Sequence, residues 1–234
     1  MGIRNKRPDL NGILNIDKPL GWSSAKVCNT VRRLSGGAKV GHAGTLDPLA
    51  TGVLVVCLGK ATKRIPGFMD ATKEYRAEID LSAFSSTDDA EGDRVEVAVA
   101  TPPGLERIRG VLDEFFIGEV EQFPPRYSAV KIDGQRAYKM ARAGEEFETR
   151  SKVVRIDSVE IVEYEWPRLV AVIECGKGTY IRSIARDLGT RLGTGGMLTG
   201  LVRTRVGEYR IEDALSVGDL EQSASDWDAS LLED

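Results

Sequence analysis

One acidic side chain stands in a segment whose composition suits the presentation of a reactive group. Residues 41–52 read Gly-His-Ala-Gly-Thr-Leu-Asp-Pro-Leu-Ala-Thr-Gly, and Asp47 is their only carboxylate. A tight loop that directly precedes a buried strand is a place where a rigid scaffold holds a catalytic group. A carboxylate held there can act as a nucleophile, which divides one difficult step into two easier ones. Taken alone, an Asp-Pro pair also starts turns and caps helices, so local composition leaves both interpretations open.

The same segment closely resembles the catalytic motif of the TruB-type tRNA pseudouridine synthase family, G-H-x-G-x-L-D-P-x-A-x-G, whose aspartate is the nucleophile. Asp47 matches that aspartate. Four more blocks, one before this segment and three after it, stand in the family's order across roughly residues 11–212; they begin at Gly12, Lys73, Pro125 and Gly176. Five ordered blocks are more specific than one short motif.

The reaction that the resemblance implies moves uracil from an N-glycosidic to a carbon–carbon bond without redox change or hydrolysis. It therefore demands no cofactor and no metal. Asp47 could attack the ribose C1′ or the uracil C6, and the sequence does not choose between them. Because the reacting atoms are inaccessible in a folded RNA loop, the nucleotide must be flipped out and held by a stacking partner.

The resemblance also implies roles for four other side chains. Tyr75 matches the tyrosine that stacks on the flipped base and is implicated in proton transfer, and Arg182 matches the arginine that pairs with the catalytic carboxylate. Tyr180 and Leu201 match positions that line the uracil pocket. From pattern alone, Tyr75, Tyr180 and Leu201 would pass as core residues and Arg182 as a solvated surface residue.

Contacts with the T arm of tRNA are implied in three places. His42, the only histidine, matches a residue that contacts the RNA loop, and Lys18 resembles a substrate-contacting lysine. The basic segment from Lys131 to Arg142 lies in an inserted, thumb-like loop, residues 122–152, that resembles a clamp on the T arm. General surface charge explains these cations equally well.

Charge distribution is more informative than the formal net charge of −4. Residues 1–76 carry 13 Lys and Arg against 5 Asp and Glu, and residues 122–212 carry 16 against 12. Residues 77–121 are acidic, and residues 213–234 carry seven acidic and no basic side chains. The two basic segments could form one positive face for RNA, or they could solvate separate surfaces.

Periodicity predicts the elements that must position these residues. Alternating or β-branched apolar runs predict strands, one-sided apolar spacing predicts helices, and glycine and proline mark the breaks. Strands are expected at 11–17, 52–59, 75–81, 153–162 and 169–175, and helices at 24–34, 104–116, 137–143 and 180–192. Residues 40–51 are expected to be loop, 85–92 an acidic turn and 193–196 a flexible exit. Without a regular βαβ repeat, this order predicts an α+β fold, a mixed but mostly antiparallel sheet flanked by helices.

Composition sets the remaining expectations. No run of about 18 apolar residues and no signal-peptide-like start occurs, which favours a cytoplasmic protein. The three cysteines lack metal or disulfide spacing, so we expect buried thiols. We expect one catalytic domain, residues 1–212, followed by an acidic tail, residues 213–234, where many family members carry a PUA-like RNA-binding domain.

The chain departs from the family pattern at two blocks. Ser82, Ser85 and Ser86 replace a glycine, a threonine and an aspartate, and Met197 and Val202 replace a histidine and an arginine. The first change does not touch catalysis, whereas the second would weaken or retune RNA contacts near Leu201.

The resemblance favours isomerisation of the uridine at position 55 in the T loop. There are two alternatives: a non-catalytic tRNA-binding chaperone on the same scaffold, and a synthase with the same chemistry on another RNA, including the guide-RNA-dependent relatives. A binder needs no nucleophile, so Asp47, Tyr75 and Arg182 together favour the enzyme. We expect a monomer, because a T-arm binder needs an open cleft.

Overall fold

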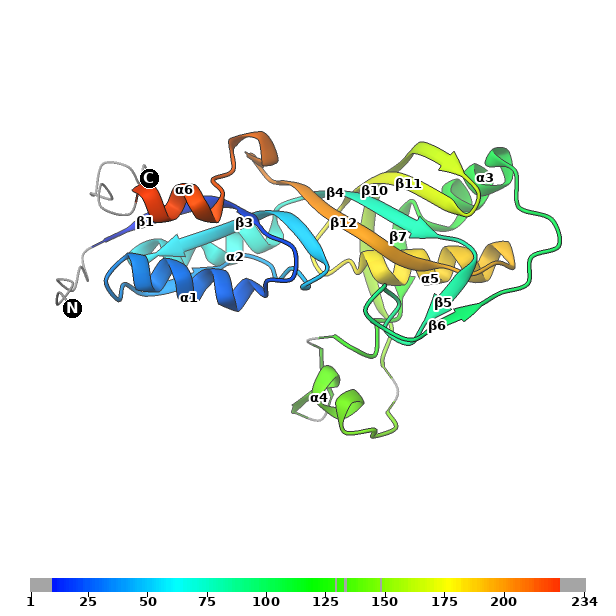
Figure 1. The fold of residues 1–234 in the computed structure, drawn as a ribbon, viewed down its shortest axis with the longest axis horizontal. Coiled ribbons are helices and arrows are strands. Elements are labelled where there is room, and N and C mark those ends of the chain that lie inside the picture. The colour runs from blue at the N-terminus through cyan, green and yellow to red at the C-terminus, as the bar shows by residue number, and fades with distance from the viewer. Residues whose placement is uncertain (1–9, 129, 133, 148, 224–234) are drawn as a thin grey trace. The chain divides into compact units, whose positions relative to one another are not determined.

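The computed structural model describes residues 10–128, 130–132, 134–147 and 149–223. The chain divides into two compact units, one formed by the residues up to Tyr75 together with those from Val202 onward, and one formed by Arg76–Leu201. The chain passes between the units within strands β4 (Lys73–Asp80) and β12 (Met197–Val206). Figure 1 labels the α-helices and the main strands of the two units.

The first unit is built on strands β1 (Gly12–Lys18) and β3 (Ala50–Leu58), which pair antiparallel with Gly12 opposite Leu58. Strand β12 follows β3 in the sheet order, β2 (Val40–His42) also pairs with β3, and β13 (Tyr209–Arg210) pairs with β12. The remaining elements of this unit are helices: α1 (Ser24–Leu34), η1 (Gly59–Arg64), α2 (Ile65–Asp70), η2 (Ile211–Asp213) and α6 (Val217–Ser223).

Helix α1 follows from its sequence. Ser23 caps it by accepting a hydrogen bond from the backbone N–H of Lys26 at 3.1 Å. Val27 and Val31 on its apolar face are fully buried and pack in one cluster with Ile16 and Leu54. Figure 1 shows α1 and α6 beside the strands of this unit.

The second unit has the strand order β4, β11 (Arg168–Cys175), β10 (Lys152–Glu165) and β7 (Gly118–Gln122). Strand β10 pairs antiparallel with both β11 and β7. Helices α3 (Leu105–Phe115) and α5 (Ile181–Leu192) supply buried apolar side chains such as Ile108 and Ile184. The shorter elements are β5 (Ala83–Ser85), β6 (Arg94–Glu96), β8 (Lys131–Ile132), β9 (Gln135–Arg136) and α4 (Ala137–Arg142).

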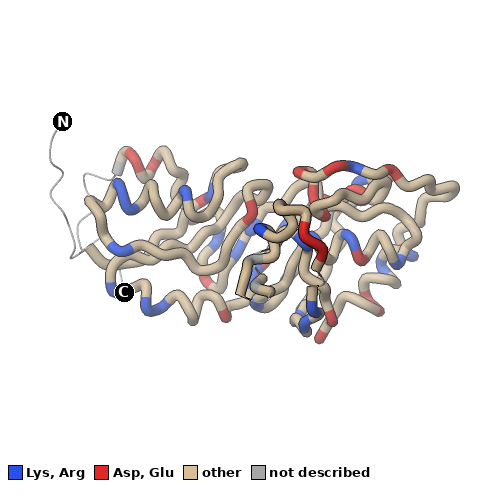
Figure 2. The backbone as a smooth tube through the Cα atoms, turned by 90° about the horizontal axis from the view of Figure 1, so that it is seen from below, with Lys and Arg blue, Asp and Glu red and all other residues tan. Residues whose placement is uncertain are grey.

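These elements confirm the predicted α+β class, with a mostly antiparallel sheet flanked by helices. All three cysteines are buried free thiols, as expected. Among the described residues, no helix is long and apolar enough to cross a membrane. Lys and Arg positions and Asp and Glu positions both occur along each unit (Figure 2), and the single positive face stays a prediction.

Two expectations were wrong in detail. Residues 40–51 are not entirely loop, because β2 pairs with β3. Residues 193–196 are not a flexible exit: Thr194, Gly195 and Gly196 are buried, and Gly195 donates its backbone N–H to Leu81 O at 2.9 Å. A Cβ on Gly195 would lie 2.1 Å from the backbone N of Ala83, so this glycine permits close packing of two backbones.

Candidate active site

The loop that carries Asp47 joins β2 to β3 and is fastened to neighbouring elements of the first unit. The hydroxyl of Ser24, at the start of α1, accepts from Leu46 N at 2.9 Å and donates to Leu46 O at 3.1 Å. Gly21 N donates to Pro48 O at 2.9 Å. Asp47 is half-buried between these two fastened positions. The backbone therefore holds the carboxylate in a defined place, as a reactive group requires.

A buried arginine lies under the same loop. Arg203, on β12, is 1% exposed and donates its Nε to Val53 O at 2.7 Å and an Nη to Gly44 O at 3.2 Å. Gly52 has a φ of +97°, and a Cβ there would lie 2.3 Å from Arg203 O. Glycine at this point lets β3 and β12 approach each other. Arg203 was not predicted as part of the site, because its partners at Gly44 and Val53 are about 150 residues away in the sequence.

His42 ends β2 and is half-buried. Within the described part of the chain, its Nδ1 is buried and has no hydrogen-bond partner. Burial and, second, the positive charge of Arg203 lower the pKa of His42, while the backbone at Gly44 opposes this shift. The imidazole is therefore held neutral near neutral pH, and it is suited to hydrogen bonding and stacking rather than to neutralising phosphate.

Lys18, at the end of β1, is fully buried. Its ammonium donates to Pro19 O at 3.0 Å and to Trp22 O at 2.6 Å, which fixes the turn before α1. In this structure the cation therefore shapes the backbone next to the Asp47 loop. Its predicted contact with RNA stays a prediction.

Tyr75 is 9% exposed and lies on β4, where side chains alternate between buried and half-buried. Lys73, two residues earlier on the same face, is also buried and donates its ammonium to the carbonyls of Phe68 at 3.2 Å and of Met69 at 2.5 Å. The lysine thereby caps the end of α2. Lys73 thus fixes the face of β4 that also carries Tyr75, which gives the lysine of the Lys-Glu-Tyr block a structural role.

Arg182 lies in the first turn of α5 in the second unit and is 5% exposed. Its guanidinium donates to Thr87 O and to Tyr127 O, both at 3.0 Å, and lies 3.4 Å from Asp89 Oδ2. The predicted solvated-surface alternative for Arg182 is therefore wrong. Its pairing with Asp47 stays a prediction.

Asp89 is a residue that sequence reasoning missed. It is 2% exposed, and its Oδ1 accepts from Thr87 Oγ1 at 2.5 Å and from Glu91 N at 3.0 Å. Asp89 retains the second aspartate of the L-G-x-x-T-D-T-x-D-x-x-G pattern, and this was the signal that could have identified it. Its carboxylate supplies the charge that keeps a buried arginine in place.

Tyr180 precedes α5 and is held through its backbone by Gln122, which ends β7. Gln122 donates Nε2–H to Tyr180 O at 3.1 Å and accepts from Tyr180 N at 2.8 Å. The ammonium of Lys152 lies 4.3 Å from the centre of the Tyr180 ring. Leu201 is half-buried on β12.

The structure therefore places the predicted residues in two groups. The first unit carries Lys18, His42, Asp47 and Tyr75, with His42 at the end of β2 and Asp47 on the loop that follows it. The second unit carries Tyr180, Arg182 and Leu201, with Tyr180 and Arg182 at the start of one helix.

The basic segment of the insertion forms the hairpin β8–β9 and helix α4, which follow β7 and precede β10 in the chain. Helix α4 is labelled in Figure 1. Backbone bonds from Ala137 N to Val130 O at 2.8 Å and from Tyr138 N to Ser128 O at 3.0 Å hold the start of α4. The predicted helix is confirmed, and the RNA contact stays a prediction.

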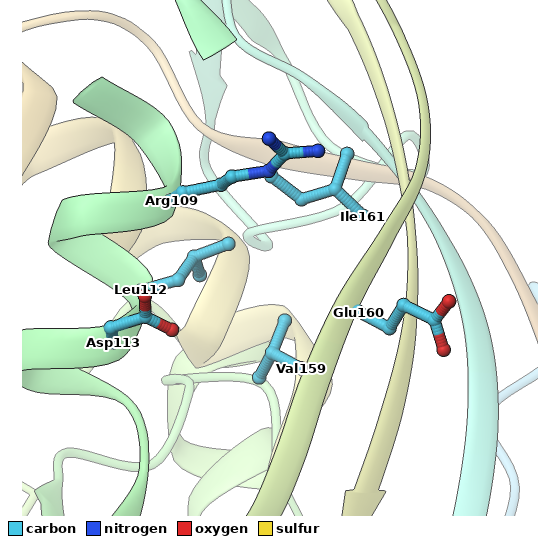
Figure 3. A pocket seen from close by; sticks show the side chains of 6 residues that line it. All are labelled: Arg109, Leu112, Asp113, Val159, Glu160 and Ile161. Atoms are coloured by element: carbon cyan, nitrogen blue, oxygen red, sulfur yellow. The ribbon is translucent and has the colours of Figure 1, made fainter. Parts of the chain in front are cut away.

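A separate hollow of about 310 Å³ lies between α3 and β10 (Figure 3). It is lined by Arg109, Leu112, Asp113, Val159, Glu160 and Ile161. Figure 3 shows the carboxylate of Glu160 pointing away from the other side chains. None of the predicted site residues lines this hollow.

Comparison with known proteins covers almost the whole chain. A family model described as TruB family pseudouridylate synthase (N terminal domain) matches residues 32–181. A second model, described as tRNA pseudouridylate synthase B C-terminal domain, matches residues 182–234.

Two relatives named tRNA pseudouridine synthase B illustrate the similarity. The protein from Phocaeicola vulgatus is 49% identical over 214 residues, which is 88% of this chain and 89% of the relative. The protein from Ruegeria sp. is 44% identical over 227 residues, which is 96% of this chain and 74% of the relative.

Solved structures are similar as well. A chain in a Cbf5-Nop10-Gar1 complex is 29% identical, with a TM-score of 0.73. A chain in an H/ACA RNP bound to a substrate RNA containing 2′-deoxyuridine is 27% identical, with a TM-score of 0.69. This protein spans 60% and 56% of the length of those two chains.

Proposed function

Because the chain belongs to the TruB family and is a tRNA pseudouridine synthase, we propose that it isomerises the uridine at position 55 in the T loop, with Asp47 as the nucleophile. The observation that carries the proposal is the fastening of the Asp47 loop. Ser24 binds both backbone groups of Leu46, and Gly21 binds Pro48 O, on either side of Asp47. A carboxylate on a loop so restrained suits nucleophilic attack.

In the proposed reaction the target nucleotide leaves its stack and enters the site. Asp47 attacks C1′ of the ribose or C6 of the uracil, the C1′–N1 bond breaks, and the uracil turns. A bond then forms between C1′ and C5, the proton leaves C5, N1 gains a proton, and Asp47 is released. Atoms and electrons balance without an added oxidant, reductant or water.

Tyr75 stacks on the flipped base and assists the proton transfer in this proposal. Its burial on a face of β4 that Lys73 fixes supports the assignment, because a stacking ring must be held in one orientation. Arg182 pairs with the Asp47 carboxylate. The hydrogen bonds of Arg182 to Thr87 O and Tyr127 O, with Asp89 beside it, support a guanidinium set in one orientation.

Four residues hold the RNA around the flipped base. His42, neutral at the end of β2, contacts the T loop. Lys18 fixes the turn before α1 and contacts the substrate. Tyr180 and Leu201 line the uracil pocket. The insertion, residues 122–152, clamps the T arm. Because Lys18 is buried and donates to the carbonyls of Pro19 and Trp22, part of its role is to hold this turn in the conformation that faces the substrate.

The experiment maps pseudouridine at single-nucleotide resolution in unmodified tRNA transcripts, with the wild type and with Asp47→Asn. Asparagine keeps the shape of the side chain but is not a nucleophile, so we expect product at the T-loop uridine to fall by at least about 10³-fold. The matched control is Asp113→Asn, an exposed carboxylate on α3, which should retain the wild-type rate.

Other results would contradict the proposal in distinct ways. Tight binding of tRNA without product from the wild type would favour a tRNA-binding chaperone. Product at another position would indicate another RNA site. A free T-arm stem-loop, supplied without any guide RNA, should also be modified, and a requirement for a guide would overturn direct recognition.

A further inference from the structure

The insertion is joined to the second unit through a neck of two paired residues. Gln122 is the last residue of β7, Lys152 is the first residue of β10, and the two are partners in the antiparallel register. Beside them, Ser151 Oγ donates to Glu121 Oε1 at 2.6 Å. Everything between these strands, including β8, β9 and α4, extends from this neck.

Gln122 acts on the backbone of Tyr180. Its side-chain amide donates to Tyr180 O at 3.1 Å and accepts from Tyr180 N at 2.8 Å, across 58 positions in the sequence. The residue is 2% exposed, so the two bonds are shielded from water. If the Tyr180 backbone moved away, the buried amide of Gln122 would be left without hydrogen-bond partners, which costs free energy. The two bonds therefore hold the backbone of Tyr180 in one position.

Lys152 acts on the ring of the same tyrosine. Its ammonium lies 4.3 Å from the ring centre and donates a hydrogen bond to Gly178 O, two residues before Tyr180. Burial lowers the pKa of Lys152. Lys152 is half-buried, and a partly desolvated ammonium over an aromatic face contributes more than a fully exposed one. Both residues of the neck therefore contact one tyrosine, from its backbone and from its ring.

Helix α5 also holds the first stem of the insertion. Ser183 Oγ and an Nη of Arg186 donate to Phe123 O at 2.8 and 3.0 Å. An Nη of Arg182 donates to Tyr127 O at 3.0 Å. The start of α5, which carries Tyr180 and Arg182, and the base of the insertion thus share one set of hydrogen bonds.

We propose that Gln122 and Lys152 are positioning residues that set the backbone and ring of Tyr180, and that they link RNA engagement by the insertion to the holding of the uracil. The inference rests on the proposed function, in which Tyr180 lines the uracil pocket and the insertion clamps the T arm. Displacement of the neck moves Tyr180, so the insertion influences the rate of the bound complex as well as its affinity.

The test compares Lys152→Met with Arg109→Met. Methionine keeps most of the stem of either side chain and removes its charge, and Arg109 is an exposed cation on α3, outside the insertion. Single-turnover rates at saturating enzyme and the tRNA dissociation constant are measured for each variant. We expect Lys152→Met to lower the saturated rate about 10-fold with the dissociation constant within about 2-fold. Arg109→Met should leave the saturated rate unchanged.

If Lys152 instead binds an RNA phosphate, the result is the reverse and overturns the inference. Affinity would then fall while the saturated rate stayed at the wild-type value. The slope of log affinity against log salt concentration would also become shallower by about one, because one counterion fewer is released. Absence of T-loop product from the wild type would instead contradict the proposed function, so the two failures are distinguishable.

A double-mutant cycle tests the route of the effect. In a Tyr180→Leu background, which lacks the ring, Lys152→Met should cost little further rate, because the contact is already gone. Full additivity would overturn the inference. Gln122→Glu provides a second variant: it replaces the amide donor to Tyr180 O by an acceptor, and it should lower the saturated rate while thermal unfolding confirms that the protein is folded.

Discussion

At the scale of single residues, several buried cations act on the backbone. Lys18, Lys73 and Arg203 are almost inaccessible to solvent and donate to carbonyl oxygens of neighbouring loops and helix ends. A buried charge is tolerated only when its donors are satisfied, so the positions of these carbonyls and of the cation depend on each other. The basic residues of the N-terminal segment, which suggest an RNA-binding surface in the sequence, therefore also fix the backbone around Asp47 and Tyr75.

The burial of His42 beside Arg203 can be tested through the pH dependence of the free energy of unfolding. Its pKa in the folded protein is lowered from 6.5, first by burial and then by Arg203, so the unfolded chain takes up the proton first as the pH falls. The stability from a neutral His42 is fully present above about pH 6.5 and is lost as the pH falls below it.

We therefore compare the free energy of unfolding of the wild type and of His42→Asn in urea between about pH 5 and pH 8. The wild type should lose more stability on acidification than the variant, because asparagine does not titrate. The carboxylates are common to both proteins and cancel in the difference. Parallel curves for the two proteins would contradict a lowered pKa at this position.

How far the site could be predicted depends on how local each role is. Asp47 and His42 lie in one short motif, so the sequence alone singles them out. Gln122 and Asp89 act through contacts with residues 58 and 93 positions away, Tyr180 and Arg182. The family motif marks Asp89 as a retained position, but no local pattern shows which distant residue Asp89 or Gln122 contacts.

At the scale of elements, patterns that repeat along the chain predicted structure well. The alternation in β4, the one-sided apolar spacing of α1 and the β-branched run of β3 correspond to their burial. Strand β12 was missed because Arg203, which looks exposed, is buried within it, and because its partners are distant in sequence. Strand β2 has only three residues, too few for a period to show.

Substitutions at two helical glycines, Gly110 and Gly189, separate the effect of helix propensity on stability from the effect of close packing. In an exposed helix interior, alanine stabilises by up to about 1 kcal/mol over glycine, and Gly110 of α3 has open space around it. Gly189 of α5 is buried, and a Cβ there would lie 2.1 Å from Gly195 O. Because that contact involves backbone, it cannot be relieved by a side-chain rotation.

We expect Gly110→Ala to raise the free energy of unfolding by about 0.5–1 kcal/mol, and Gly189→Ala to lower it by about 1–3 kcal/mol. Urea denaturation followed by circular dichroism measures both. Since the two glycines belong to the same unit, a shift in the same direction for both variants would show that propensity outweighs the close approach of α5 to Gly195.

At the scale of the whole molecule, a net charge of −4 coexists with a polyanionic substrate. The seven acidic side chains of residues 213–234 account for more than this net charge. The first part of that segment is structural: α6 buries Leu220 completely against Ile16 and Val27, and Arg33 pairs with Glu221 at 2.9 Å. The segment predicted as an acidic tail thus contains an element of the first unit.

Two shortened chains separate packing from charge. A chain ending at Ser223 keeps α6 and loses four carboxylates without any cation, so it should bind tRNA more tightly at low salt. A chain ending at Ser216 also loses Leu220, and burial of a leucine contributes about 2–4 kcal/mol to the free energy of unfolding. Leu220→Ala in the full chain keeps every charge and should reproduce most of that loss. Urea unfolding and tRNA titrations at two salt concentrations measure both effects, and equal stability of the chains ending at Ser216 and Ser223 would contradict a structural role for α6.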